Sequence, residues 1–429
     1  MPLRRLDLRG FTGDLSGALP APADEQERSS AAVAAIIGEV RSGGDEALRR
    51  LTERFDGVVI DELRVPDAEV DAALARVPEP LRRALEVANA RIVAYHAHEA
   101  APVGDFESDG VRVRHLTRPV ARAGCYAPGG RARYPSTVLM CVAPARVAGV
   151  GQVVLCVPPG PDGRVDDATL AAARIAGVDE VYRVGGAQAI AAMAYGTVSL
   201  PAVDVIVGPG NRYVAEAKRQ VSGVVGVASA FAGPSEIVVV AGPGTPPDLA
   251  AVDLVVQAEH GPDGLAWLVT WSEEVADAVD AAVDRIVGAS PRRDDLEATL
   301  GTGGYAVVVD GPDEALAVSN VVAPEHLELL VEGAEELLPL VRSAGAVFLG
   351  VDAPASLGDY LAGPNHVLPT NRTARFASAL RVDDFRRHLH AVSVDGTVMD
   401  ALGPYVITLA EAEGLPAHAE SIRLRQGPR

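Results

Sequence analysis

The chain has 429 residues, of which 48% are hydrophobic, and this is enough for two or more domains with a large core. Its formal net charge of −20 argues against a nucleic-acid surface and against docking on anionic lipid. The three cysteines form no CxxC pair and no disulfide framework, and no apolar run reaches the roughly 18 residues of a membrane span. We therefore expect a soluble cytoplasmic protein.

The first quarter of the chain is predicted to be mainly helical. A helical pattern covers residues 24–56 and is interrupted by Gly43 and Gly44. A further helix, rich in Ala and Arg, is expected over residues 78–100. Residues 111–120 then alternate apolar and polar side chains, which predicts a half-exposed strand.

Strands and helices alternate from Gly124 onward. Short β-branched runs predict buried strands, and segments with helical spacing follow them. The expected strands cover residues 153–157, 180–184 and 203–207 with short runs near Val225 and Val239, and the expected helices cover residues 166–176, 185–195 and 211–220. A βαβ series of this kind predicts a doubly wound parallel sheet.

Two glycine-rich loops stand where such a sheet binds ligands, beyond the carboxyl ends of its strands. They are Gly185-Gly-Ala-Gln188 and Gly208-Pro-Gly-Asn211. Glycines there let backbone N–H groups approach phosphates at helix N-termini. The sequence contains no G-x-G-x-x-G, so a conventional dinucleotide site is not predicted. The loops are equally compatible with tight turns that only connect strand to helix.

A second αβ series begins with the apolar run Ile237–Ala241. Further strands are expected over residues 265–270, 306–309 and 346–349, and helices over residues 248–260 and 312–320. The chain becomes rich in loops from Asp352, with a short helix expected over residues 382–389 and another over 404–413.

This pattern predicts two Rossmann-like doubly wound αβ domains that lack the usual dinucleotide fingerprint, with a helical N-terminal region and a small C-terminal extension. The expected boundaries are residues 1–23 for an N-terminal segment, 24–122 with 236–380 for the first domain, 123–235 for the second domain, and 381–429 for the C-terminal segment.

One candidate metal site begins at the end of the helix expected over residues 248–260. Gln257 and His260 lie three positions apart, so they share a helix face and could both bind one metal ion. Such a pair is more often only a polar helix end. Asp359 and His418, in loops rich in Gly and Pro, would complete a set of two imidazoles, one carboxylate and one amide oxygen that suits Zn²⁺. These residues can meet only if the fold brings them together.

Glu325 and His326 form a second constellation. A glutamate can activate water, and a histidine with a pKa near 6.5 can take an alcohol proton at neutral pH. The commoner meaning of this dipeptide is an exposed pair at the start of a helix or strand. Lys218 is the only lysine, and its helical context indicates a surface position.

Taken together, the motifs resemble the histidinol dehydrogenase family. The resemblance runs from about residue 24 to the C-terminus. It rests on Ala232-Gly-Pro-Ser-Glu, Gln257-Ala-Glu-His-Gly-Pro, Pro324-Glu-His-Leu-Glu, Gly358-Asp-Tyr, Gly363-Pro-Asn-His-Val-Leu-Pro-Thr, Gly414-Leu-Pro-Ala-His, Tyr126-Ala-Pro-Gly-Gly, Val184-Gly-Gly-Ala-Gln-Ala-Ile-Ala and Val207-Gly-Pro-Gly-Asn-Arg-Tyr-Val.

The resemblance implies a zinc- and NAD-dependent enzyme that oxidises L-histidinol to L-histidine through L-histidinaldehyde, the last step of histidine biosynthesis. It implies one zinc per subunit, held by Gln257, His260, Asp359 and His418. It further implies Glu325 and His326 as the acid–base pair. The implied substrate contacts are Ser235, His366 and Glu413, together with His326 and the four metal ligands. The implied NAD contacts are Tyr126, Gln188 and Asn211.

The resemblance also implies a homodimer with shared active sites. The C-terminal segment would reach into the partner's site, so Glu413 and His418 would come from the other subunit. Three alternatives stay open. The enzyme could oxidise another amino or hydroxy alcohol, although His366 and Glu413 favour histidinol. It could be a zinc hydrolase that uses Glu325 and a metal-bound water without NAD. A thiohemiacetal route through Cys125, beside Tyr126, is a rival chemistry.

Overall fold

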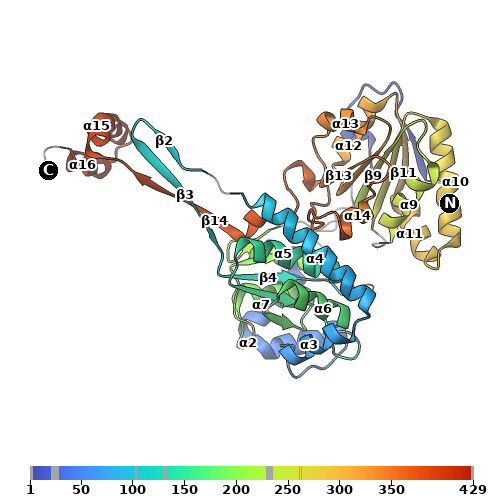
Figure 1. The fold of residues 1–429 in the computed structure, drawn as a ribbon, viewed down its shortest axis with the longest axis horizontal. Coiled ribbons are helices and arrows are strands. Elements are labelled where there is room, and N and C mark those ends of the chain that lie inside the picture. The colour runs from blue at the N-terminus through green and yellow to red at the C-terminus, as the bar shows by residue number, and fades with distance from the viewer. Residues whose placement is uncertain are drawn as a thin grey trace. The chain divides into compact units, whose positions relative to one another are not determined.

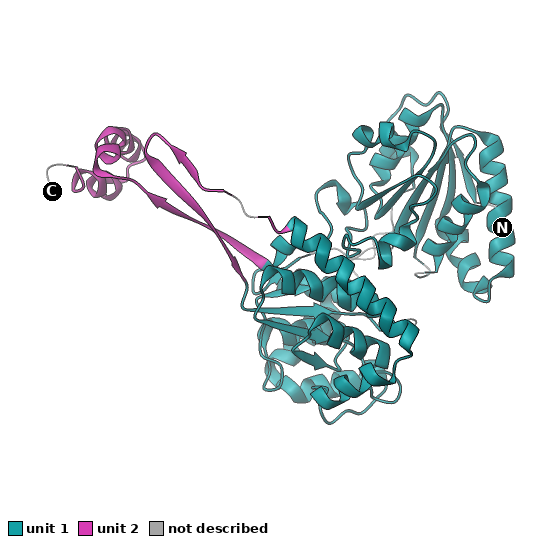
Figure 2. Cartoon of the chain, in the orientation of Figure 1, with its two compact units in different colours: residues 1–99, 120–385 teal, residues 100–119, 386–429 magenta. Residues whose placement is uncertain are grey.

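The computed structural model describes residues 3–20, 29–101, 104–129, 133–228, 235–259, 261 and 263–426. The chain forms two compact units (Figure 2). Unit 1 contains residues 1–99 and 120–385, and unit 2 contains residues 100–119 and 386–429. Within the described ranges, no helix has both the length and the apolar character to cross a bilayer.

Unit 1 contains a parallel sheet that we name the β4 sheet after its central strand (Figure 1). Its strand order is β6-β5-β4-β7-β8, and every neighbouring pair is parallel. The strands are β4 (Arg122–Tyr126), β5 (Gln152–Cys156), β6 (Glu180–Tyr182), β7 (Val205–Val207) and β8 (Gly226–Val227). The connecting helices are α5 (Pro135–Ala148), α6 (Asp167–Ala176), α7 (Gly186–Tyr195) and α8 (Arg212–Val221).

Unit 1 also contains a second parallel sheet, the β9 sheet, with the strand order β1-β11-β10-β9-β12-β13. The strands are β1 (Arg4–Asp7), β9 (Glu236–Ala241), β10 (Leu265–Thr270), β11 (Gly304–Val308), β12 (His326–Leu330) and β13 (Ala346–Leu349). The helices along this stretch are α9 (Pro247–Ala258), α10 (Glu273–Ala289), α11 (Arg293–Gly303), α12 (Pro312–Val322), α13 (Ala334–Leu337) and α14 (Ala355–Tyr360).

The two sheets have the same strand topology. In each, the chain starts at the central strand, adds two strands on one side, and returns to add two on the other. Strand β1 extends the β9 sheet by pairing with β11. Short apolar runs such as β9, which is buried throughout, suit strands that are covered on both faces. The prediction of two Rossmann-like αβ domains is confirmed.

The N-terminal helices pack on the helices of the β4 sheet. Helix α2 (Ser30–Asp56) contacts α7 and α8, α3 (Asp67–Arg76) contacts α6, and α4 (Glu79–Glu99) contacts α5 and α6. The sequence analysis had placed residues 24–122 in one domain with residues 236–380, which form the β9 sheet. The structural reason for the difference is that the apolar stripe of α2, from Val33 to Val40, is buried in one core with α7. The expected interruption of α2 is present at Gly44, which has a φ of 53°.

Unit 2 is an antiparallel sheet followed by two helices. Its strand order is β14-β3-β2, with β2 (Phe106–Ser108), β3 (Val111–Pro119) and β14 (Arg386–Ser393), and its helices are α15 (Gly396–Ala412) and α16 (Pro416–Arg423). The prediction of a helix over residues 382–389 is wrong. A 3₁₀ turn over Val382–Phe385 leads into β14, because residues 386–393 pair with residues 112–119 of β3.

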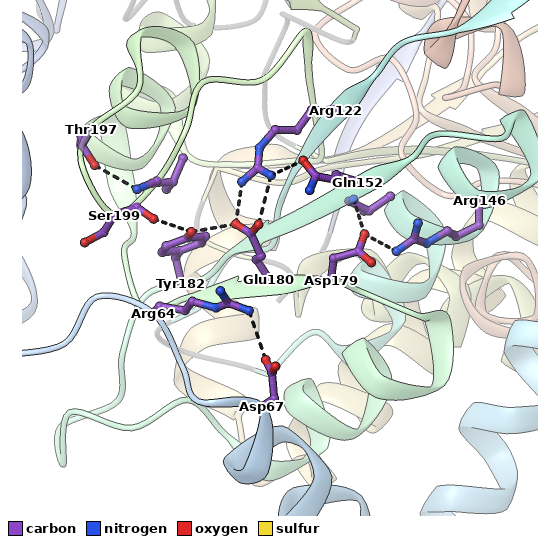
Figure 3. Close-up of polar contacts among 12 residues, drawn as sticks. Arg64, Asp67, Arg122, Arg146, Gln152, Asp179, Glu180, Tyr182, Thr197 and Ser199 are labelled. Atoms are coloured by element: carbon purple, nitrogen blue, oxygen red, sulfur yellow. Dashed lines mark hydrogen bonds and ion pairs between the residues drawn. The ribbon is translucent and has the colours of Figure 1, made fainter.

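The amino edge of the β4 sheet is held together by a buried ionic network (Figure 3). The Arg122 guanidinium donates to Gln152 and, through two nitrogens, to both carboxylate oxygens of Glu180 at 3.1 and 2.6 Å. The Tyr182 hydroxyl also donates to Glu180, at 2.7 Å. The hydrogen bonds from Arg122 and Tyr182 outweigh burial and hold the pKa of Glu180 below its usual value. Strands β4, β5 and β6 are thus joined at the edge opposite Tyr126.

Candidate active site

Glu325 and His326, the expected acid–base pair, lie at the amino edge of the β9 sheet. Glu325 directly precedes β12, and His326 is its first residue. In the parallel register His326 stands beside Ile237 of β9 and Ala346 of β13. In open parallel sheets ligands usually bind at the carboxyl edge, so this pair occupies the opposite edge from the one that the general rule indicates.

The pair is buried, which removes the interpretation as an exposed dipeptide. Glu325 is 8% exposed and His326 is 3% exposed. His326 Nδ1 lies 3.9 Å from Glu325 Oε2, and its Nε2 lies 3.4 Å from Asp359 Oδ1. Glu325 Oε2 also accepts the backbone N–H of Glu236, at 3.3 Å. Since Ser235 immediately precedes Glu236, the structure brings Ser235 to this edge too.

The charges around His326 act in opposite directions on its pKa. Burial lowers it, but the carboxylates of Glu325, Asp359 and Glu328 outweigh burial and raise the pKa of His326 to about 9. A cation bound to Asp359 would offset one of these negative charges and so favour the neutral imidazole. A base that takes a proton at neutral pH needs that form.

A cavity of about 740 Å³ adjoins the pair and is lined by His326, Asp359 and His366 among others. The Nδ1–H of His366 donates to the backbone carbonyl of Asp359 at 2.7 Å, and its Nε2 lies 3.4 Å from Thr137 Oγ1. Burial lowers the pKa of His366. His366 is therefore a neutral ring whose Nδ1–H is held by the Asp359 carbonyl and whose Nε2 lies beside Thr137.

Asn365, next to His366, is anchored by a histidine that sequence reasoning did not single out. Its amide donates to the carbonyl of Met140 at 2.6 Å and lies 3.2 Å from His96 Nε2. His96 is fully buried, and its Nδ1 lies 2.9 Å from Glu99. These contacts fix the loop that carries His366.

The metal ligands implied by the resemblance are only partly placed. Gln257 is 2% exposed in the last turn of α9. Since α9 returns the chain from the end of β9 to the start of β10, this turn lies at the amino edge, where Asp359 and His326 also lie. His260 lies outside the described residues. His418 and Glu413 belong to unit 2, where both are exposed.

Across the described ranges, no three His, Cys, Asp or Glu side chains gather as a metal site. The set implied by the resemblance nevertheless fits zinc chemically. It combines an amide oxygen and a carboxylate at one sheet edge with two imidazoles, and Zn²⁺ accepts this mixture of nitrogen and oxygen ligands. The carboxylate of Asp359 is 19% exposed and lines the cavity.

The residues expected to bind NAD lie at the carboxyl edge of the β4 sheet. Tyr126 ends β4, and its hydroxyl accepts the N–H of Gly186 at 3.1 Å, where α7 begins. Gly208 follows β7 with a φ of 105°, and a Cβ there would lie 2.1 Å from the Tyr126 carbonyl oxygen. Strands β4 and β7 flank the point where the winding reverses, the usual ligand crevice of such sheets.

Gln188 and Asn211 belong to the same edge. Gln188 is 2% exposed and folds against Gly186. The Asn211 oxygen caps α8 by accepting the N–H groups of Tyr213 and Val214 at 3.0 and 3.1 Å. Its amide N–H₂ can therefore donate to a ligand, while its oxygen is occupied.

A family model described as histidinol dehydrogenase matches residues 19–426 of the chain. The chain belongs to the histidinol dehydrogenase family. The histidinol dehydrogenase of Parasynechococcus marenigrum is 48% identical over 404 residues, which cover 94% of this chain and 92% of that protein. The histidinol dehydrogenase of Gluconobacter oxydans is 44% identical over 428 residues, 99% of each chain. The crystal structure of histidinol dehydrogenase from Elizabethkingia anophelis matches with a TM-score of 0.94 and 34% identity, covering 99% of this chain and 98% of that chain.

Membership of the histidinol dehydrogenase family confirms the resemblance seen in the motifs and makes the protein an oxidoreductase. The structure also bears on the rival route through Cys125. This side chain is fully buried, and burial raises the pKa of its thiol well above the usual value. A thiohemiacetal route needs a thiolate at neutral pH, so the site does not favour it.

Lys218 is the residue that sequence reasoning misplaced. It was interpreted as a surface lysine, but it is 2% exposed, and its ammonium group donates to the carbonyl of Gly208. Lys218 lies four residues after Val214 and three before Val221, on the buried stripe of α8. That helical spacing was visible in the sequence and would have indicated burial.

Proposed function

We propose that this enzyme oxidises L-histidinol to L-histidine in two NAD-dependent steps, as the last reaction of histidine biosynthesis. One alcohol, two NAD⁺ and one water would give the carboxylate, two NADH and three protons. The observation that carries the proposal is the contact of the buried His326 with Glu325 and Asp359 beside a cavity, in a chain that matches the family from residue 19 to residue 426.

The side chains of this cluster suit both steps. His326 takes the proton of the alcohol in the first oxidation, and the resulting aldehyde stays in the cavity. Glu325 accepts a proton from the water that hydrates the aldehyde before the second oxidation. His366 and Ser235 hold the substrate beside the buried pair of Glu325 and His326.

Two cofactors support this chemistry in the proposal. Zinc held by Gln257, His260, Asp359 and His418 would orient the amino and imidazole nitrogens of histidinol, and NAD bound beside Tyr126, Gln188 and Asn211 would accept the hydrides. Zinc has no redox chemistry of its own, so it needs a separate hydride acceptor.

We further propose that the enzyme works as a homodimer, in which Glu413 and His418 complete the active site of the partner subunit. The supporting observation is the apolar surface of unit 2. Tyr405 and Leu409 on α15 are 71% and 64% exposed, and Leu424 at the C-cap of α16 is 76% exposed. Exposed apolar side chains gathered on a small unit are typical of a protein interface.

The test is NADH formation from L-histidinol by the purified protein, before and after removal of metal and again with zinc restored. Two NADH per histidinol, lost on chelation and recovered with zinc, are expected. No NADH from folded, zinc-loaded protein would refute the assignment and direct the search to other amino or hydroxy alcohols. Turnover of an ester or amide that does not need NAD would favour a zinc hydrolase instead.

A further inference from the structure

The loop that carries His366 is held by helices α4 and α5, which pack with the β4 sheet. Met140 on α5 accepts a hydrogen bond through its carbonyl from the Asn365 amide nitrogen, at 2.6 Å. The Asn365 oxygen in turn accepts the N–H of Val367, at 2.9 Å. A carbonyl can only accept and a backbone N–H can only donate, so these two partners fix the orientation of the Asn365 amide.

The orientation of Asn365 decides which nitrogen of His96 carries the proton. One N–H of the amide is used by Met140, and the other is left for His96 Nε2, 3.2 Å away. Nε2 is therefore the acceptor, and the ring proton lies on Nδ1. The Nδ1–H of His96 then donates to Glu99 Oε2, at 2.9 Å.

Glu99, the last residue of α4, ends this chain of hydrogen bonds. Its Oε1 accepts from Arg381 Nε at 2.7 Å, and its Oε2 also accepts the N–H of Val382 at 3.2 Å. Burial raises the pKa of Glu99, but the hydrogen bonds from His96 and Val382 outweigh burial and leave that pKa below its usual value. Glu99 is therefore ionised at neutral pH, with a donor at each carboxylate oxygen.

The chain of Glu99, His96 and Asn365 gives a direction that apolar side chains would not give. His96 is fully buried, and a polar ring in such a place is costly unless its nitrogens are bonded. Each nitrogen has one partner, so a single arrangement satisfies all three side chains. Asn365 directly precedes His366, whose ring donates to the carbonyl of Asp359 at 2.7 Å. The same chain therefore sets where the His366 ring lies.

We propose that Glu99, His96 and Asn365 are positioning residues for substrate binding, which act by holding the His366 ring in place. The inference rests on the proposed function, in which His366 contacts histidinol. The effect of the three residues on histidinol passes through His366. A small displacement of that ring is costly, because a hydrogen bond weakens steeply once its length and angle depart from the favourable range.

The test measures the dissociation constant of L-histidinol by calorimetry, with zinc-loaded protein and without NAD. Glu99→Leu removes every acceptor at the end of the chain. Glu99→Gln keeps one oxygen for His96 and Val382 and loses only the bond to Arg381, whose side chain is 54% exposed. Leu85→Ala is the matched control, since Leu85 is a buried residue on α4 about three turns before His96.

A double-mutant cycle shows whether the effect passes through His366. His366→Ala is measured alone and in combination with Glu99→Leu. If Glu99 acts only by positioning His366, its replacement has no further effect once the imidazole is absent. A role confined to stability would lower the unfolding temperature of Glu99→Leu and leave the histidinol affinity unchanged.

We expect Glu99→Leu to bind histidinol about 10-fold more weakly, Glu99→Gln to stay within about threefold of wild type, and the double variant to match His366→Ala. Leu85→Ala should lower thermal stability and keep the wild-type affinity. Wild-type affinity in folded Glu99→Leu would overturn the inference, and so would a glutamine variant as weak as the leucine, an equal loss in Leu85→Ala, or additive losses in the double variant. If Glu99→Leu does not fold, His96→Phe takes its place, with the same expected loss and the same refutation.

This design separates the inference from the proposed function. Wild-type protein that neither binds histidinol nor forms NADH from it would refute the function and remove the basis of the inference. Wild-type protein that does both, beside a Glu99→Leu variant with unchanged histidinol affinity, would refute the inference alone.

Discussion

Lys218 offers a direct test of the burial seen in the β4 sheet, because it is the only lysine in the chain. Its side chain is 2% exposed, and no carboxylate pairs with it in the described part of the chain. Burial lowers the pKa of Lys218 from 10.5 to about 8. The perturbation that removes this titration is Lys218→Met, which keeps much of the length and apolar stem of the side chain.

The size of the effect follows from proton linkage. A shift of this size is worth roughly 3 kcal/mol, at about 1.4 kcal/mol per pKa unit. The folded-state pKa is the lower one, so burial of the charge destabilises the protein fully below about pH 8. That destabilisation fades as the pH rises from about 8 toward 10.5. Between about pH 7 and pH 9.5, wild type should gain about 2 kcal/mol of unfolding free energy relative to Lys218→Met.

Two measurements test this prediction. Carbon-13 labelling of lysine gives a single side-chain NMR signal in this chain, and its chemical shift against pH reports the pKa directly. Denaturant unfolding of wild type and Lys218→Met at both pH values gives the difference in free energy. The comparison with the variant cancels the titration of every other group.

The outcome that refutes the reasoning is an NMR midpoint near the ordinary value of 10.5 with no pH-dependent difference between the two proteins. Such a result would mean that water reaches the ammonium group, and the packing of α8 against the Gly208 turn would then be wrong.

Three further predictions concern activity. Gly208→Ala should raise the KM for NAD far more than the KM for histidinol, because the new methyl group would meet the carbonyl oxygen of Tyr126; equal changes in both constants would contradict a cofactor role for this turn. Glu325→Gln should reduce aldehyde oxidation more than aldehyde formation, because Glu325 is proposed to act only when the aldehyde is hydrated. The two steps are measured with histidinol and histidinaldehyde as separate substrates, and equal loss of both would contradict the separate roles of Glu325 and His326. Cys125→Ser should keep activity within about threefold, because a buried neutral thiol takes no part in turnover; loss of aldehyde oxidation alone would revive the thiohemiacetal route.

Much of the fold could be predicted from the sequence, because the signals for αβ units are local. Buried strands such as β9 and β10 are short runs of β-branched and apolar residues, and the helices between them show apolar side chains at helical spacing. The motifs around Glu325 and Gln257 were also sufficient to indicate the family, which the comparisons confirm.

Other features depend on partners that are distant in the chain. Residues 386–393 form a strand because β3 offers a pairing edge, whereas the sequence alone predicted a helix over residues 382–389. Likewise α2 packs on α7, although the sequence grouped it with the β9 sheet.

The sequence by itself therefore determined the αβ class, most of the elements and the family, and it predicts the residues that carry the chemistry. The tertiary structure decided that Glu325, His326, Asp359 and His366 meet at the amino edge of one sheet, and that the glycine-rich loops occupy the carboxyl edge of the other. Hydrophobic periodicity is a local property of the sequence. Strand order and register, in contrast, decide at which edge of a sheet a side chain lies and which groups it contacts there.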